Sequence, residues 1–149
     1  MTSFLCNNTN GEKMKKLFTT LFLMVTMLVF LSACSTQASL VDTKWQLTSL
    51  AGKSPLPDAK ITLNFSKDAI GGSDGCNTYG GSYKSVKDTI TFGNDIFSTM
   101  MYCTDEIAVQ YQAYYEMLNQ TATYKINDGV LSLMDAKGIV LAEFTASQD

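Results

Sequence analysis

Most of this chain alternates apolar and polar side chains every second residue, in short runs separated by turn residues. Ile61, Leu63 and Phe65, for example, alternate with threonine, asparagine and serine. Period two with β-branched and aromatic residues is typical of half-buried strands, because successive side chains of a strand point to opposite faces. The same spacing recurs at Trp45 and Leu47, Ile90 and Phe92, Tyr124 and Ile126, and Leu131 and Leu133. The pattern predicts a chain made mainly of short strands. Turns such as Asn127-Asp128-Gly129 and Ala136-Lys137-Gly138 favour hairpins between them.

One segment has a different period. From Thr104 to about Gln120 no glycine or proline occurs, and the apolar residues fall at helical spacing: Ile107, Ala108, Tyr111, Tyr115 and Leu118. Thr104 is the expected N-cap of this helix. We expect Tyr114 to lie beside the apolar stripe and to be exposed as part of a contact surface. The predicted fold class is mainly β (α+β), an antiparallel barrel-like sheet with one helix packed across it.

The beginning of the chain has the features of an export signal. A basic start at Met14 precedes an apolar run of about 15 residues, which is shorter than the roughly 20 needed to span a membrane. The run ends in Leu-Ser-Ala-Cys, which resembles a bacterial lipobox and implies cleavage before Cys34 and acylation of its sulfur. A plain secretory signal and a retained anchor helix are the alternatives. We therefore expect a leader over residues 1–33, a lipidated tether over 34–42 and one domain over 43–149.

Charge and composition argue against several functions. The chain has no histidine and no arginine, and its formal charge is −3. Without the predicted leader, eight lysines stand against thirteen acidic residues, which gives −5. Nucleic-acid binding calls for a basic patch, so we expect no nucleic-acid partner. We also expect no cofactor and no metal.

Two cysteines remain after the predicted leader and its anchor. Because exported proteins fold under oxidising conditions, Cys76 and Cys103 are predicted to form a disulfide. A free reactive cysteine is a weaker interpretation, since no histidine is present to activate it. Met100 and Met101 beside Cys103 could suggest a soft copper site, but core packing and the disulfide explain them better.

The stretch Gly-Gly-Ser-Asp-Gly, over residues 71–75, matches the pattern of a hydrolase nucleophile. A nucleophile elbow needs a helix after the serine and a histidine partner. The residues that follow predict a strand, and a phosphate loop lacks the same helix. We therefore predict no catalytic residue here. Ser73 and Asp74 are expected to carry no chemistry, and the glycines to let strands bend or approach closely.

Three segments together resemble the META domain family. They are Gly-Cys-Asn-Thr-Tyr-Gly-Gly-Ser-Tyr over residues 75–83, Ser-Thr-Met-Met-Tyr-Cys over 98–103, and the helical segment 111–118. The resemblance covers roughly residues 43–145. It implies a β-rich barrel-like domain with a helix, in bacterial envelope proteins linked to heat or other stress, and no established catalytic residues. Met100 stands where the family often has arginine, so no role of that arginine carries over.

Three classes of function remain open at this stage. The first is a non-enzymatic envelope lipoprotein, lipid-anchored at Cys34, that contacts an unidentified envelope protein during stress. The second is an anchored inhibitor of a secreted enzyme, whose acidic surface would suit a basic target. The third is a lipocalin-like carrier with a ligand inside the barrel. In each case we expect a monomer, and sorting to the outer membrane facing the periplasm.

Overall fold

A computed structural model of the protein describes residues 39–147. The predicted leader, its start at Met14, Cys34 and most of the tether lie outside these residues. Within 39–147 no helix is long and apolar enough to cross a membrane.

Nine strands and one helix make up the described part of the chain. In order they are β1 (Thr43–Leu50), β2 (Thr62–Phe65), β3 (Ala69–Ser73), β4 (Thr78–Val86), β5 (Thr89–Phe92), β6 (Phe97–Ser98), α2 (Asp105–Gln120), β7 (Thr123–Asn127), β8 (Val130–Met134) and β9 (Val140–Ala146).

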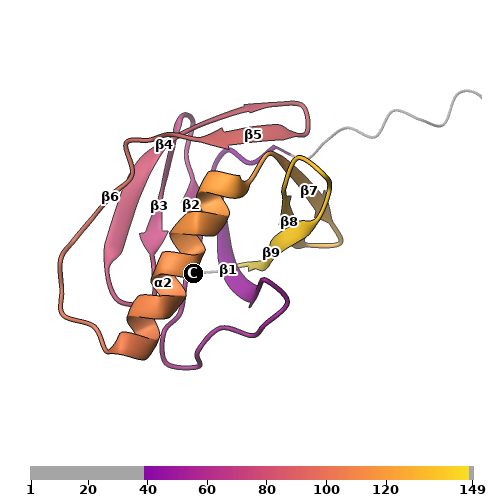
Figure 1. Ribbon diagram of the computed structural model, residues 1–149. Coiled ribbons are helices and arrows are strands. Elements are labelled where there is room, and N and C mark those ends of the chain that lie inside the picture. Colours follow the sequence, from indigo (N-terminus) through magenta and orange to yellow (C-terminus); the bar gives the residue numbers. More distant parts are fainter. Residues whose placement is uncertain (1–38, 148–149) are drawn as a thin grey trace, which may run out of the picture. The chain divides into compact units, whose positions relative to one another are not determined.

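All of the strand pairs are antiparallel, and the sheet closes on itself into a ring. The order is β3-β2-β1-β9-β8-β7-β5-β4-β6, and β3 also pairs with β4 (Figure 1). The pairing between β5 and β7 is short: Thr89 faces Thr123, and the Tyr124 N–H donates to the Asp88 carbonyl at 2.8 Å. The predicted fold class, a mostly antiparallel sheet with one helix across it, is confirmed.

The interior of the ring holds the residues that alternate along the strands. Leu63, Leu131, Leu133 and Phe144 are fully buried, and the other alternating residues join them in one cluster: Trp45, Leu47, Ile61, Phe65, Ile90, Phe92 and Tyr124. Leu40 is also buried, so packing begins a few residues before β1. Burial of apolar area is the main term that stabilises such a domain.

Turn chemistry fixes the register of the hairpin between β7 and β8. Asp128 and Gly129 both have positive φ, at 49° and 77°, and together form the two-residue turn between β7 and β8. Two positive φ values in a row characterise a type I′ turn, whose twist matches that of the strands. The predicted hairpin is therefore confirmed.

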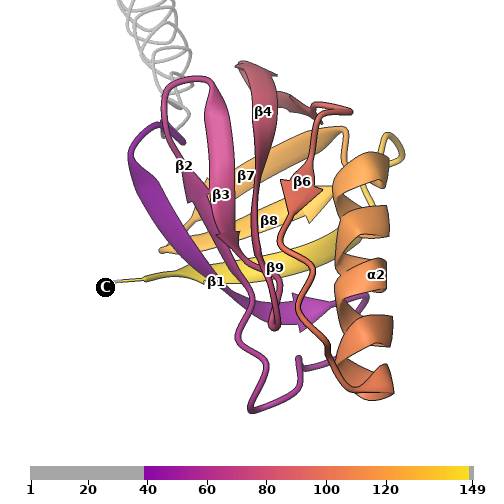
Figure 2. The same cartoon turned by 90° about the vertical axis from the view of Figure 1, so that its left-hand side faces the viewer.

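The helix α2 covers one side of the sheet (Figure 2). Its buried residues are Tyr114, Met117 and Leu118, and its N-cap is Thr104, although the threonine side chain makes no capping hydrogen bond. The prediction that Tyr114 is exposed is wrong, because its exposed fraction is 0%. Tyr114 lies three residues after Tyr111 and four before Leu118, so helical geometry places it on their face rather than beside it.

The predicted disulfide between Cys76 and Cys103 is present, with the two Cα atoms 6.1 Å apart. It joins the turn after β3 to the residue that precedes the N-cap of α2.

Candidate functional site

The glycine-rich stretch forms a strand, a turn and a strand, and its centre is a buried carboxylate. Asp74 is 1% exposed, and its Oδ1 accepts hydrogen bonds from the backbone N–H groups of Cys76, at 2.9 Å, and Asn77, at 2.6 Å. Its Oδ2 accepts the hydroxyl of Tyr115 at 2.8 Å. Asp74 therefore joins the turn to α2. A side chain at Gly72 would collide with the carbonyl oxygen of Thr62, which explains a glycine there.

A second buried polar side chain, Asn77, holds the segment that follows β6. Its Oδ1 accepts the Thr99 hydroxyl at 3.0 Å and the Met101 N–H at 2.8 Å. Thr99 also donates its N–H to the Thr78 carbonyl at 3.0 Å. The disulfide fixes Cys103 at the far end of this segment. The backbone of residues 97–103 is thus tied at both ends and in the middle.

The side chains of this tied segment point outward. Phe97 is 68% exposed, Met100 99%, Met101 59% and Tyr102 95%. We call these four residues the contact segment. The expectation that Met100 and Met101 pack in the core is wrong, because Asn77 and the disulfide hold the backbone here and leave both side chains in solvent. A copper site is not supported either, since Cys103 is committed to the disulfide.

The contact segment lies away from the point where the chain enters the domain. In both views the connection from β6 to α2 runs at the lower end, whereas the first described residues and the start of β1 are at the upper end (Figures 1 and 2). The connection from β6 to α2 and the first described residues therefore lie at opposite ends of the domain (Figures 1 and 2).

Three tyrosines form a ladder between β4 and α2, and two of them, Tyr79 and Tyr114, are buried. The hydroxyl of Tyr79 donates to the Thr62 carbonyl at 2.9 Å and lies 2.5 Å from the hydroxyl of Tyr114. The Tyr115 ring stands edge-on to Tyr79, with their centroids 5.9 Å apart. Burial raises the pKa of Tyr79 and Tyr114 above the ordinary value. Burial also raises the pKa of Tyr115, helped by the hydrogen bond to the Asp74 carboxylate.

This ladder predicts that the domain loses stability at high pH. The unfolded tyrosines ionise near pH 10, whereas Tyr79, Tyr114 and Tyr115 keep their protons in the fold. The unfolded chain then binds fewer protons than the folded one, so the free energy of unfolding falls as the pH rises above about 10. Tyrosinate absorbance and near-ultraviolet circular dichroism, followed together, should show the last tyrosines ionising only as the native signal disappears. Complete ionisation with an intact native signal would contradict this.

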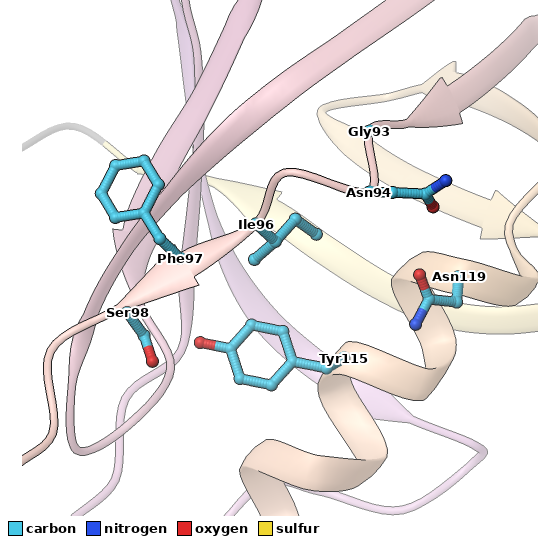
Figure 3. Close-up of a pocket in the computed structure, with 7 residues that line it drawn as sticks. All are labelled: Gly93, Asn94, Ile96, Phe97, Ser98, Tyr115 and Asn119. Carbon is cyan, nitrogen blue, oxygen red and sulfur yellow. The ribbon is translucent and has the colours of Figure 1, made fainter.

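A pocket of about 380 Å³ lies between β6 and α2, beside the contact segment. Figure 3 shows Tyr115 reaching from α2 toward Ser98, with Ile96 facing the same space and Asn94 and Asn119 at the other end. No aspartate, glutamate or lysine is among the residues that line it. The Asn94 and Asn119 side chains are exposed, and within residues 39–147 neither makes an internal hydrogen bond.

Sequence reasoning located some of these residues and missed others. It paired Cys76 with Cys103 and assigned the glycines to structure, but it gave Asp74 and Asn77 no role. The sequence pattern predicted that Tyr114 is an exposed tyrosine, but the exposed tyrosine among the described residues is Tyr102. The motif Asp-Gly-Cys-Asn offered a signal, because aspartate and asparagine next to glycine often bind nearby backbone N–H groups.

These features define a class: a small ring-closed β domain with one helix, in which a disulfide and the buried side chain of Asn77 hold an exposed apolar segment. The META domain family model matches residues 38–148, and the chain belongs to that family. A comparison with curated proteins gives no significant match.

Solved structures share this fold. An NMR structure of a protein from Burkholderia xenovorans is 27% identical, with a TM-score of 0.62, and the match covers 74% of this chain and 85% of that one. A crystal structure of a DUF4847 family protein from Bacteroides vulgatus is 14% identical, with a TM-score of 0.55 over 74% of this chain and 96% of that one. At such identity the second shows the fold alone.

Proposed function

We propose that this protein works by binding another protein of the bacterial envelope, through the contact segment, and not by catalysis. The observation that carries the proposal is the exposure of Phe97, Met100, Met101 and Tyr102 on a backbone tied by Asn77 and the disulfide. Methionine and aromatic side chains are enriched at protein interfaces, and contiguous apolar groups in solvent mark such sites.

The rigidity of the segment supports this function in a second way. Ordering a flexible loop on binding costs free energy, whereas a loop that is already held keeps most of its contact energy. Two partly buried hydrogen bonds to Asn77 and the disulfide hold this segment. An interface here would therefore need little rearrangement of the backbone.

The proposed lipid anchor at Cys34 suits the position of the segment. Five residues lie between Cys34 and the buried Leu40, so the two Cα atoms can be at most about 20 Å apart. The connection from β6 to α2 lies at the opposite end of the domain from the first described residues (Figures 1 and 2), so an anchored domain would hold the contact segment away from the membrane surface. The proposal that the protein lies in the outer membrane, facing the periplasm, rests on the lipobox resemblance alone.

The two alternatives fare differently. A carrier would need space inside the ring, but large buried side chains such as Phe144 and Leu133 fill it. An inhibitor of a secreted enzyme remains the second candidate, because a rigid exposed loop is also what such proteins insert into a target. The link to heat or other envelope stress rests on the family resemblance.

Complementation of a deletion strain tests this function. Met100→Ser/Tyr102→Ser changes two fully exposed side chains, so the free energy of unfolding should change by less than about 0.5 kcal/mol. This variant and Cys34→Ala should both lose protection against heat and membrane-active drugs at normal protein level.

Val86→Ser is the matched control, since Val86 is 69% exposed and lies outside the contact segment. It should protect like the wild type. Full protection by the Met100→Ser/Tyr102→Ser variant would refute a contact function of this segment.

A further inference from the structure

We infer that the pocket between β6 and α2 is a binding site for an uncharged sugar of one or two rings. Phe97 belongs both to the contact segment and to the lining of this pocket, but Met100, Met101 and Tyr102 do not line it. The inference does not rest on the proposed protein contact, because other side chains carry it.

The polar groups of the pocket match a neutral ligand with many hydroxyls. Asn94 and Asn119 each offer one amide donor group and one carbonyl acceptor, and neither is used within the described domain. An amide that donates and accepts at once is suited to a pair of adjacent hydroxyls. A charged ligand would find no opposite charge in the lining. The nearby Asp95 is not among the lining residues, and its Oδ1 accepts the N–H and hydroxyl of Ser82, at 3.1 and 2.8 Å.

The apolar part of the pocket matches the other side of a sugar ring. The aromatic ring of Tyr115 and the side chain of Ile96 face the same space (Figure 3). A sugar has hydroxyls at its edges and C–H groups on its faces, and the face can pack on an aromatic ring while the edges bind the amides. The volume of about 380 Å³ lies within the range of small-molecule sites.

The Tyr115 wall is held in place before any ligand arrives. The Tyr115 hydroxyl donates to Asp74, which two backbone N–H groups hold in turn. The Ser98 side chain also hydrogen-bonds to the Tyr115 hydroxyl, which holds the ring further. A preorganised wall lowers the ordering cost of binding. The buried Asp74 thus supports both the turn and the pocket.

The test is a titration of the whole chain with N,N′-diacetylchitobiose, an uncharged disaccharide, in a detergent without a sugar headgroup. Backbone amide NMR shifts should move at Asn94, Ser98, Tyr115 and Asn119, and saturate in the millimolar range. Asn119→Ala removes up to two hydrogen bonds and should weaken binding about tenfold. Gln120→Ala removes the neighbouring exposed amide, outside the lining, and should leave binding unchanged.

Cellobiose, glycerol and a neutral tetrapeptide complete the design. Saturable shifts at the pocket with either disaccharide, lost in Asn119→Ala, support the site. No saturable shift with either disaccharide overturns it. Equal shifts with glycerol, or binding of the peptide alone, also overturn it. The Met100→Ser/Tyr102→Ser variant should bind the disaccharide like the wild type, so failure of the contact proposal would not remove this site.

Discussion

Replacing Asp74 with alanine should lower the free energy of unfolding by about 3 to 5 kcal/mol. The change leaves two backbone N–H groups, those of Cys76 and Asn77, without their acceptor, and also the Tyr115 hydroxyl. An unpaired buried donor costs about 1 to 3 kcal/mol. The free energy of unfolding of a domain of this size is only about 5 to 15 kcal/mol, so the variant should lose a large fraction of its stability. Urea denaturation of the purified chain measures the effect.

Two further variants separate the hydrogen bonds from other effects of the change. Asp74→Asn keeps one oxygen for the two backbone N–H groups, so it should cost about half as much. Ser73→Ala removes a side chain that accepts one 3.2 Å bond from Gly75, and should cost less than about 1 kcal/mol. If Asp74→Ala is as stable as the wild type but inactive, Asp74 carries chemistry and the structural role is wrong.

Loss of the disulfide should have the second largest effect on stability. Cys76→Ser/Cys103→Ser opens a loop of 27 residues, and the chain-entropy model gives about 3 to 4 kcal/mol for its closure. The fold class should persist, because the buried core lies inside the ring and does not include these residues. Chemical denaturation with and without reductant measures the cost.

Reductant supplies the internal control for this prediction. It should bring the wild type to the denaturation midpoint of the double variant and leave the double variant unchanged. A double variant as stable as the oxidised wild type would show that the bond does not contribute. If the double variant also loses the contact function at a normal protein level, the result supports the role of the disulfide in holding the contact segment.

Local patterns predicted the strands and the helix because each pattern reflects burial along one element. Leu63 and Leu133 alternate with polar residues since one face of each strand meets the core. The β6 strand, only two residues long, has no pattern to detect. The prediction for Tyr114 is wrong because the apolar stripe of the helix was drawn without it. Its spacing from Tyr111 and Leu118, three and four residues, already places it on the buried face.

The candidate site was harder to predict because it depends on contacts between distant segments. Whether Met100 is buried or exposed depends on Asn77, twenty-three residues earlier, which binds the backbone beside it. The pocket needs Asn94 and Asn119 to meet across β6 and α2. No period or motif in either segment encodes that meeting. The cysteines were the exception, because only two remained to pair.

Photo-crosslinking in living cells tests the contact function most directly. A photoreactive residue is placed at position 102 in one strain and at position 86, the matched exposed position, in another. We predict that position 102 gives a discrete adduct with one envelope protein, which increases under heat stress, and that position 86 does not. No adduct at position 102, or the same adducts at both positions, would contradict a function that works through the contact segment.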